Sequence, residues 1–237
     1  MPFSSPWTKP GASSGEREGE NMDLLYDKKY TCPLCQREFT NKRVRISKIR
    51  IKQVDSDFCT HYHGENPNYY LVIICPFCGF TYTENNSEIK IQGKENLIKF
   101  LKGNRLKDDF TGARNDELAL KAFFRAVNLG ESRKEKNLVL ANLYLQTAWI
   151  YRFMEDGEKE REYLQKALNY FLEFYEKDSR TGNLAKVLYV IAELYRRLGN
   201  EKEAVFWFGR IIKDKSITDA GIIRKAREQW QLIRGYE

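Results

Sequence analysis

The pattern of apolar and polar positions changes near Gly93. From Asp23 to about Ile91, apolar residues form short runs rich in Val, Ile and Tyr between turn residues, which is typical of β-strands. After Gly93, apolar residues recur every three or four positions almost to the end of the chain, which is the period of an α-helix. The sequence therefore predicts an α+β protein, with a small β-rich part at residues 22–92 and a helical part at residues 93–237.

Residues 1–21 follow neither period and are rich in Pro, Gly, Ser and Glu, a composition typical of disorder. In a bacterial gene, Glu18-Gly19-Glu20 can be encoded by a purine-rich ribosome-binding sequence shortly before the codon of Met22. We therefore expect residues 1–21 to be either a disordered segment or an untranslated leader.

One predicted strand, from Lys42 to Val54, has a basic and an apolar face. Lys48, Arg50 and Lys52 alternate with Ile49 and Ile51, and alternate residues of a strand point to opposite sides. The alternation slips near Ser47, where we expect a β-bulge. Cations on a strand can follow the phosphates of a nucleic acid. A solvated outer face that discourages strand pairing is the other interpretation.

The helical part contains a repeat pattern. In a frame of about 34 residues that starts at Ala185, small and apolar residues fall where tetratricopeptide repeats need them. These positions are Leu188, Ile191, Ala192, Tyr195, Gly199, Ala204, Phe208 and Ile211. A looser helical hairpin precedes this unit, and further helices are expected at residues 116–130 and 222–233. The sequence predicts stacked helical hairpins that bury a shared core.

The first helix of each hairpin in such arrays lines a concave surface, which gives a candidate binding groove. Its positions mix cations with aromatic side chains, the residue types that anchor interfaces. They suit a partner peptide that carries carboxylates or aromatic side chains. The predicted groove residues are Asn142, Trp149, Arg152, Lys186, Tyr189, Arg196 and Arg227.

Composition and charge narrow the function. The chain of 237 residues has a formal net charge of +7, most of it after Gly93, which favours an acidic partner and leaves a nucleic acid possible. The sequence contains no Gly-rich phosphate loop, no nucleophile elbow and no helical zinc-protease pair, so no catalytic residue and no small-molecule substrate is identified. It has neither a membrane-length apolar run nor a signal core, so we expect a cytoplasmic protein.

Two cysteine pairs carry the clearest chemical signal. Cys32 and Cys35, like Cys75 and Cys78, are separated by two residues, and paired turns of this kind supply the four thiolates of a structural zinc ion. The sequence predicts one structural Zn2+. Disulfides, a redox pair or separate core thiols are the alternatives, of which disulfides are disfavoured in a reducing cytoplasm.

A second metal site is a further hypothesis. Between the pairs lies the segment Asp55-Ser56-Asp57-Phe58-Cys59-Thr60-His61-Tyr62-His63. An extended backbone would direct Asp55, Asp57, Cys59, His61 and His63 to one side, and we take Cys59, His61 and His63 as the candidate ligands. Three ligands of this kind leave a position open for water, as a catalytic zinc requires. A buried thiol beside two surface histidines is the alternative.

The chain resembles an uncharacterised bacterial family catalogued as domain of unknown function 2225. The resemblance rests on four motifs in order, Cys32-Pro33-Leu34-Cys35, Asp55-Ser56-Asp57-Phe58-Cys59, Asn66-Pro67-Asn68-Tyr69-Tyr70 and Cys75-Pro76-Phe77-Cys78-Gly79. It implies an amino-terminal zinc ribbon followed by helical repeats over most of residues 22–237. It implies no activity, and neither His61 nor His63 matches a family motif.

These observations predict a zinc-binding, non-catalytic adaptor that uses a helical-repeat groove to bind an acidic or aromatic peptide or protein. The first alternative is a zinc ribbon that binds nucleic acid through Lys48, Arg50 and Lys52. The second is a metalloenzyme with a site at Cys59, His61 and His63.

Overall fold

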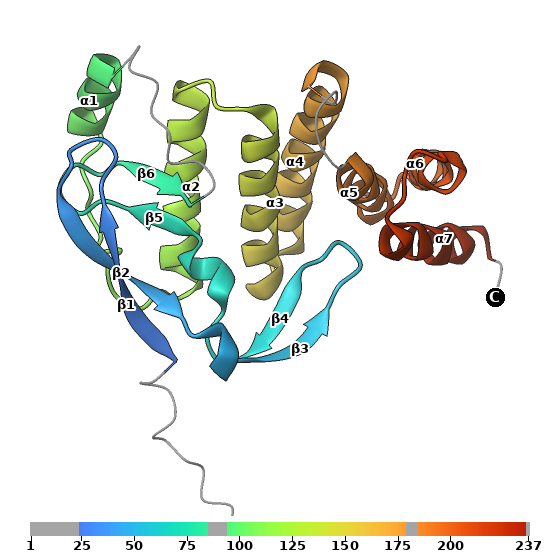
Figure 1. The fold of residues 1–237 in the computed structure, drawn as a ribbon, viewed down its shortest axis with the longest axis horizontal. Coiled ribbons are helices and arrows are strands. Elements are labelled where there is room, and N and C mark those ends of the chain that lie inside the picture. The colour runs from blue at the N-terminus through green and yellow to red at the C-terminus, as the bar shows by residue number, and fades with distance from the viewer. Residues whose placement is uncertain (1–23, 85–93, 179–183, 236–237) are drawn as a thin grey trace, which may run out of the picture.

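A computed structural model describes residues 24–84, 94–178 and 184–235. Residues 1–21 and the expected boundary at residues 92 and 93 lie outside this range. The strands are β1 (Leu25–Thr31), β2 (Glu38–Val44), β3 (Arg50–Val54), β4 (Thr60–His63), β5 (Val72–Ile74) and β6 (Thr81–Thr83). The α-helices are α1 (Lys94–Gly103), α2 (Asp116–Ser132), α3 (Asn137–Phe153), α4 (Gly157–Asp178), α5 (Leu184–Arg197), α6 (Glu201–Lys213) and α7 (Ala220–Arg234). The order of strands followed by helices confirms an α+β fold (Figure 1).

The strands form three antiparallel pairs, β1 with β2, β3 with β4, and β5 with β6. Their sequences explain their different burial. The apolar residues of β5 are all buried, whereas every residue of the basic strand β3 is exposed. The predicted continuous strand from Lys42 to Val54 is wrong. A 3-10 turn at Ile46–Lys48 separates β2 from β3 and causes the slip near Ser47, and the register irregularity lies between Ile51 and Gln53 instead.

The α-helices lie in the part of the chain where apolar residues recur every three or four positions. Asn115, Asn200 and Asp219 accept backbone hydrogen bonds as the N-caps of α2, α6 and α7, which satisfies amide groups that a helix start leaves without partners. Gly199, with φ of 84°, separates α5 from α6. From α2 to α7 each helix packs against the next in the sequence, so the helices form a row (Figure 1).

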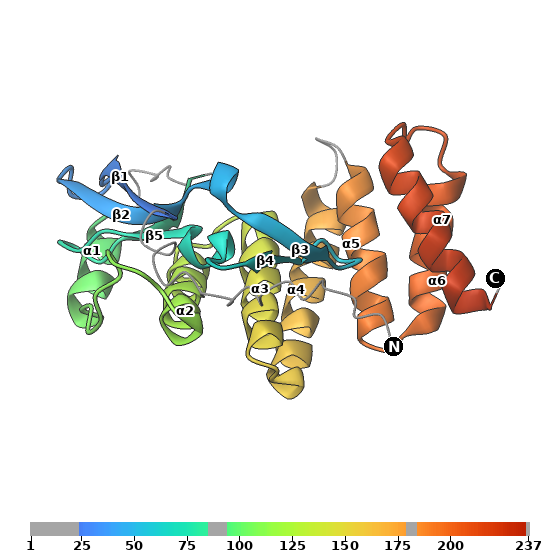
Figure 2. The same ribbon diagram turned by 90° about the horizontal axis from the view of Figure 1, so that it is seen from below.

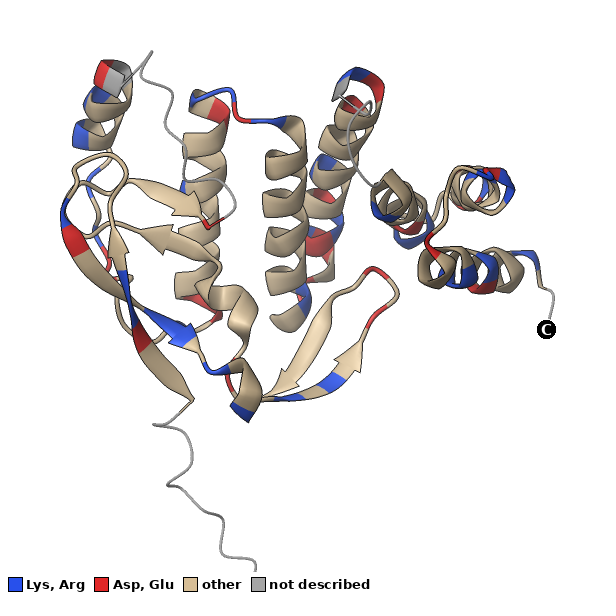
Figure 3. Ribbon diagram, in the orientation of Figure 1, with Lys and Arg blue, Asp and Glu red and all other residues tan. Residues whose placement is uncertain are grey.

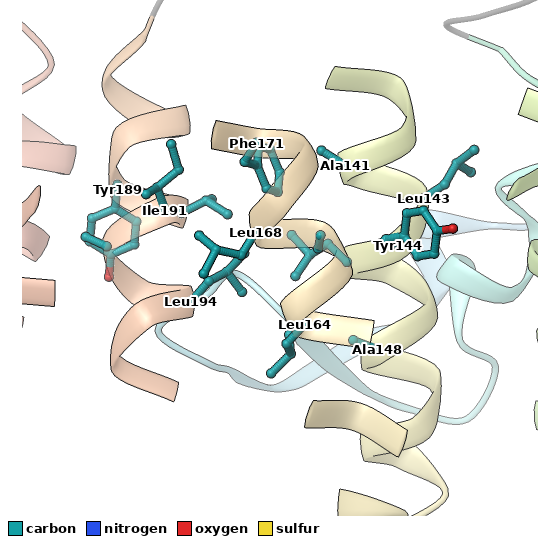
Figure 4. Packing of buried hydrophobic residues seen from close by; sticks show 14 of the residues in the cluster. Ala141, Leu143, Tyr144, Ala148, Leu164, Leu168, Phe171, Tyr189, Ile191 and Leu194 are labelled. Atoms are coloured by element: carbon teal, nitrogen blue, oxygen red, sulfur yellow. The ribbon is translucent and has the colours of Figure 1, made fainter. Parts of the chain in front are cut away.

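The main core lies between these helices. Figure 4 shows Leu164, Leu168 and Phe171 of α4 between α3 on one side and α5 on the other. Ala141 and Ala148 of α3 are fully buried, and such small side chains let the helices approach closely. None of the helices in the described ranges is both long enough and apolar enough to cross a membrane.

The β-rich part is joined to the helices through this core. Val72 and Ile74 of β5 belong to the same buried cluster as Phe123 of α2. Arg114, which precedes α2, is buried and donates hydrogen bonds to the carbonyls of Tyr69 and Val72 at 3.0 and 2.8 Å. Seen from below, the β3–β4 hairpin extends along the row of helices as far as α5 (Figure 2). This placement creates the second of the two sites described next.

Candidate functional site

The two cysteine pairs lie in matching turns, which we call the knuckles. The first connects β1 to β2, and the second connects β5 to β6. In the first, the amide of Gln36 donates to the carbonyl of Cys32 at 2.9 Å; in the second, Gly79 donates to Cys75 at 2.8 Å. Gln36 and Gly79 have φ of 60° and 73°. Positive φ favours glycine, as expected at Gly79, whereas Gln36 adopts the same conformation with a side chain.

The four sulfurs of the knuckles converge. The Sγ atoms of Cys32 and Cys78 are 3.6 Å apart, those of Cys35 and Cys75 are 3.7 Å apart, and all four lie within 4.8 Å of one another. Four sulfurs at ~2.3 Å from a tetrahedral zinc ion would be ~3.8 Å apart. The four cysteines are free thiols, so they form a plausible metal site rather than two disulfides.

The surroundings of the knuckles favour a bound cation. Cys32 and Cys75 are fully buried in a small core with Leu34 and Phe80, where uncompensated thiolates would be costly. Hydrogen bonding with Cys32 lowers the pKa of Cys75 and raises that of Cys78. A divalent ion would replace the thiol protons and stabilise all four sulfurs.

Gly79 also couples the second knuckle to the helices. Its carbonyl accepts a hydrogen bond from Nε of Arg125 on α2 at 3.0 Å. A Cβ at this position would lie 2.4 Å from a guanidinium nitrogen of Arg125. Glycine at this position therefore accommodates both the positive φ and the close approach of this flexible side chain.

The second site is built on the tip of the β3–β4 hairpin, residues 55–59. The amide of Asp55 donates to the carbonyl of Cys59 at 2.8 Å, and Phe58 donates back to Asp55 at 3.0 Å. Phe58 has φ of 70°, at the loop position where a three-residue hairpin turn usually has a glycine. A phenylalanine in this conformation indicates that contacts outside the turn hold the tip in place.

The acidic side chains of the tip bind arginines of the helices. Asp57 is fully buried, and its carboxylate accepts hydrogen bonds from Nη1 and Nη2 of Arg152 at 3.0 and 2.7 Å. Trp149 donates its indole N–H to the same carboxylate at 3.0 Å, and Arg197 lies 3.2 Å from it. Burial alone would raise the pKa of Asp57, but hydrogen bonds and charge from Arg152 outweigh burial and lower it. Asp57 is therefore held as a carboxylate.

The remaining residues of the tip contact α5 and α7. The ring of Phe58 lies against Tyr189, with centroids 5.2 Å apart, and the ammonium groups of Lys186 and Lys225 lie over it at 5.1 and 5.9 Å. The carbonyl of Ser56 accepts a hydrogen bond from the hydroxyl of Tyr189 at 3.0 Å, and its hydroxyl bonds to Glu193. The tip is thus held by cation–π, aromatic and polar contacts together.

The structure divides the predicted groove residues into three groups. Five of them contact the hairpin tip, so the tip covers this part of the predicted groove. These five residues are Trp149, Arg152, Lys186, Tyr189 and Arg196. Asn142 bonds instead to the carbonyl of Leu138 in its own helix. Arg227 lies apart from the tip, in a groove between α6 and α7.

The predicted second metal set is only partly brought together. The ligand atoms of Asp55, Cys59 and His61 lie within 4.8 Å of one another, whereas His63 is exposed at the far end of β4 opposite Arg50 and is outside the cluster. Including His63 was therefore wrong, because strict alternation carries it away from the turn along the strand. Asp55 takes its place because the turn sets it opposite Cys59.

The environment of this cluster shifts two pKa values. Burial would raise the pKa of Asp55, but hydrogen bonds from His61, Gln53 and Arg152 lower it to about 2. Burial raises the pKa of the Cys59 thiol to about 12, so by itself this cysteine is an unreactive thiol. Only a cation that replaces its proton would convert it to a thiolate.

The basic residues proposed for nucleic-acid contact, Lys48, Arg50 and Lys52, are all exposed, the first in the 3-10 turn and the others on β3. Residues that our sequence analysis did not select also complete the tip's surroundings: Arg197 of α5, and Glu160 of α4, which accepts a hydrogen bond from Arg152 at 2.8 Å. One signal in the sequence could have indicated that the tip binds the helices. Asp55, Asp57 and Phe58 carry the carboxylates and the aromatic ring that we predicted for a peptide bound in the groove.

No curated protein and no solved structure matches this chain. A family model does match it over residues 25–233, a range that includes both knuckles, the hairpin tip and all seven helices. The chain therefore belongs to the family described as an uncharacterized protein conserved in bacteria (DUF2225).

Proposed function

We propose that this protein is a non-catalytic adaptor, stapled by one zinc ion at the knuckles, whose tetratricopeptide-like helices bind an acidic and aromatic segment of a partner protein. A zinc ion held by four sulfurs has no open position for a substrate, so its role is to stabilise the fold. Because the tip of the hairpin covers the face formed by α3 and α5, the partner binds at a different place, the groove between α6 and α7.

The α6–α7 groove has the size and polarity of a peptide site. Its volume is about 790 Å3, and its walls include the side chains of Phe206, Ile212 and Trp230. Phe206 is 55% exposed, so part of its ring can contact a partner. An aromatic or aliphatic side chain of a partner would bury this surface, at a gain of roughly 25 cal/mol per Å2 of apolar area.

Charges around the groove favour an acidic partner. Arg210, Lys213, Arg227 and Arg234 line it, with Asp214 as the acidic residue among its lining residues. Figure 3 shows Lys and Arg on both α6 and α7. Guanidinium groups form paired hydrogen bonds with carboxylates, and excess charge of one sign accelerates the approach of an oppositely charged partner.

The observation that best supports this proposal is the contact between the helices and their own hairpin. Arg152 binds the carboxylates of Asp55 and Asp57, while Tyr189 and Lys186 hold the ring of Phe58. The same helical array therefore holds an acidic and aromatic segment intramolecularly. The groove beside Arg227 repeats this combination of arginines with aromatic rings at a place that the hairpin tip does not cover.

Selection from a random peptide display library on the full chain tests the proposal. We expect enriched peptides to combine Asp or Glu with an aromatic residue, and a Lys213→Glu, Arg227→Glu variant to lose at least tenfold in affinity for them. The control, Lys99→Glu with Lys202→Glu, makes the same charge change on exposed positions outside the groove and should bind normally. Enrichment without acidic residues, or equal loss in both variants, would contradict the proposal. Salt-sensitive nucleic-acid binding that requires Lys48, Arg50 and Lys52 would support the alternative.

A further inference from the structure

A second cluster of metal-ligand types lies at the base of the hairpin tip. Hairpin geometry explains how Asp55, Cys59 and His61 meet: Cys59 and His61 are two residues apart and share one side of the chain, and the turn pairs Asp55 with Cys59. The Nε2 of His61 lies 2.9 Å from Oδ2 of Asp55. The three ligand atoms are within 4.8 Å of one another.

A polar pocket begins at this cluster. It has a volume of about 460 Å3, and its walls include His61, Lys52, Tyr69 and Asp116. The hydroxyl of Tyr69 donates to Asp116. Asp55 and Cys59 lie behind His61 and are mostly buried, so His61 is the member of the cluster through which solvent reaches it.

We propose that Asp55, Cys59 and His61 bind a second zinc ion, with a water molecule as its fourth ligand on the side of this pocket. A carboxylate, a thiolate and an imidazole are all ordinary zinc ligands, and three protein ligands with an open position are the arrangement found in catalytic zinc sites. The site is independent of the knuckles and of the α6–α7 groove.

The spacing fits this ion after a small adjustment. Bonds of ~2.0 Å to oxygen and nitrogen and ~2.3 Å to sulfur place tetrahedral ligands ~3.3–3.5 Å apart when only one of them is sulfur. His61 and Asp55 are closer than that, so the imidazole must withdraw slightly toward the pocket, on which it is partly exposed. Binding replaces the hydrogen bond between His61 and Asp55: the proton on Nε2 of His61 moves through solvent to Nδ1, and the thiol proton of Cys59 passes to solvent.

Carboxylates and cations are interleaved around the tip. Among the described residues, Asp55, Asp57, Glu160 and Glu193 face Arg152, Arg196 and Arg197, and the ammonium groups of Lys186 and Lys225 lie over the ring of Phe58. The convergence of the three ligand atoms, and not the net charge of the surroundings, is what favours an ion here.

The arginine nearest to the cluster is occupied by other acceptors. Arg152 contacts Asp55 at 2.7 Å, but it also binds both carboxylate oxygens of Asp57 and one carboxylate oxygen of Glu160. Gln53 donates to the other oxygen of Asp55 at 2.7 Å. Hydrogen bonds of this kind orient a carboxylate ligand, as the outer contacts of known metal sites do.

Zinc content of the purified full chain, measured by native mass spectrometry after dialysis against dilute Zn2+, tests the proposal. We expect two zinc ions on the unmodified protein and one on the Cys59→Ser and His61→Ala variants. His63→Ala is the matched control, because His63 lies on the same strand outside the cluster, and it should keep two. A single ion on the unmodified protein, or two on His61→Ala, would overturn the proposal.

Cobalt substitution provides a second readout that does not depend on Cys59→Ser folding normally. The first equivalent of Co2+ should give the intense thiolate bands of the four-sulfur site, and the second a weaker band from one thiolate. Loss of that weaker band in His61→Ala but not in His63→Ala supports the site. Its persistence in both variants shows that the second ion binds elsewhere and refutes it.

Discussion

The knuckles and the hairpin tip both place cysteines in short turns between strands, but they neutralise buried charge in opposite ways. At the knuckles the four sulfurs converge from two turns, and a cation that replaces their protons would stabilise all four as thiolates. At the tip the buried carboxylate of Asp57 is paired with Arg152 and Arg197 of the helices. The four cysteines therefore form a plausible site for an ion, whereas the carboxylate of Asp57 is satisfied by arginines of the protein itself.

This difference distinguishes the knuckles, which are a folding element, from the hairpin tip and the arginines that bind it, which we call the clamp. The four sulfurs come from two separate hairpins, so an ion bound by all four is expected to hold the two knuckle hairpins together. The tip instead connects residues of the β-rich part to helices α3, α5 and α7. Removing an ion should break the first site, and removing an arginine should break the second.

The largest effect is expected from Cys75→Ser. Losing one of four ligands should remove the knuckle ion, and structural zinc contributes about 10 kcal/mol or more to folding in small zinc domains. We expect one zinc fewer per chain and loss of protection of the β5–β6 amides in hydrogen exchange. Cys59→Ser, which is outside the knuckles, should keep that protection. Unchanged protection in Cys75→Ser would show that the ribbon folds without its ion.

Arg152→Met should be the next most damaging change. It preserves much of the side chain's bulk but leaves Asp57 buried with weaker compensation, and breaking a buried ion pair typically costs about 3–5 kcal/mol. The free energy of unfolding in urea measures the loss. Arg224→Met on α7 is the control. Arg224 is exposed and forms a long ion pair of 3.8 Å with Glu228, so its loss should cost under ~0.5 kcal/mol. Equal costs would mean that the tip is not clamped by charge.

Trp149→Phe tests one hydrogen bond of the clamp. The ring is largely retained, but Asp57 loses the indole N–H, and a hydrogen bond to a charged group contributes about 1.5–3 kcal/mol. The matched control is Trp207→Phe, because the buried indole nitrogen of Trp207 has no hydrogen-bond partner among the described residues. Urea unfolding should show the greater loss for Trp149→Phe, and the reverse order would contradict the assigned hydrogen bond.

What could be predicted from the sequence was local. The spacing of the cysteine pairs indicated the knuckles, and the repeat frame placed the turn between α5 and α6 at Gly199, because both signals depend on residues that are neighbours in the chain. The strand from Lys42 to Val54 was misjudged because alternation alone does not distinguish a bulge from a 3-10 turn.

The clamp could not be predicted because its partners are far apart in the sequence. Arg152 and Asp57 were each recognised as functional candidates, one as part of a groove and the other within a polar segment. No periodicity indicates that one binds the other, since the pairing depends on how the hairpin lies across the helices. The complementary chemistry was present in the sequence, and only the three-dimensional structure shows that the two belong together.

The smallest effect concerns the backbone of the tip, and it separates strain from contact at Phe58. Both Phe58→Ala and Phe58→Gly lose the ring that packs on Tyr189, but only glycine relieves a positive φ that costs other residues about 1–2 kcal/mol. After the greater chain entropy of unfolded glycine is subtracted, Phe58→Gly should be more stable than Phe58→Ala by roughly 0.5–1 kcal/mol. The same pair at Gln53 on β3 should show the opposite order, because glycine weakens a strand. If alanine is preferred at both positions, the turn is not strained, and contacts with the helices are not needed to explain its conformation.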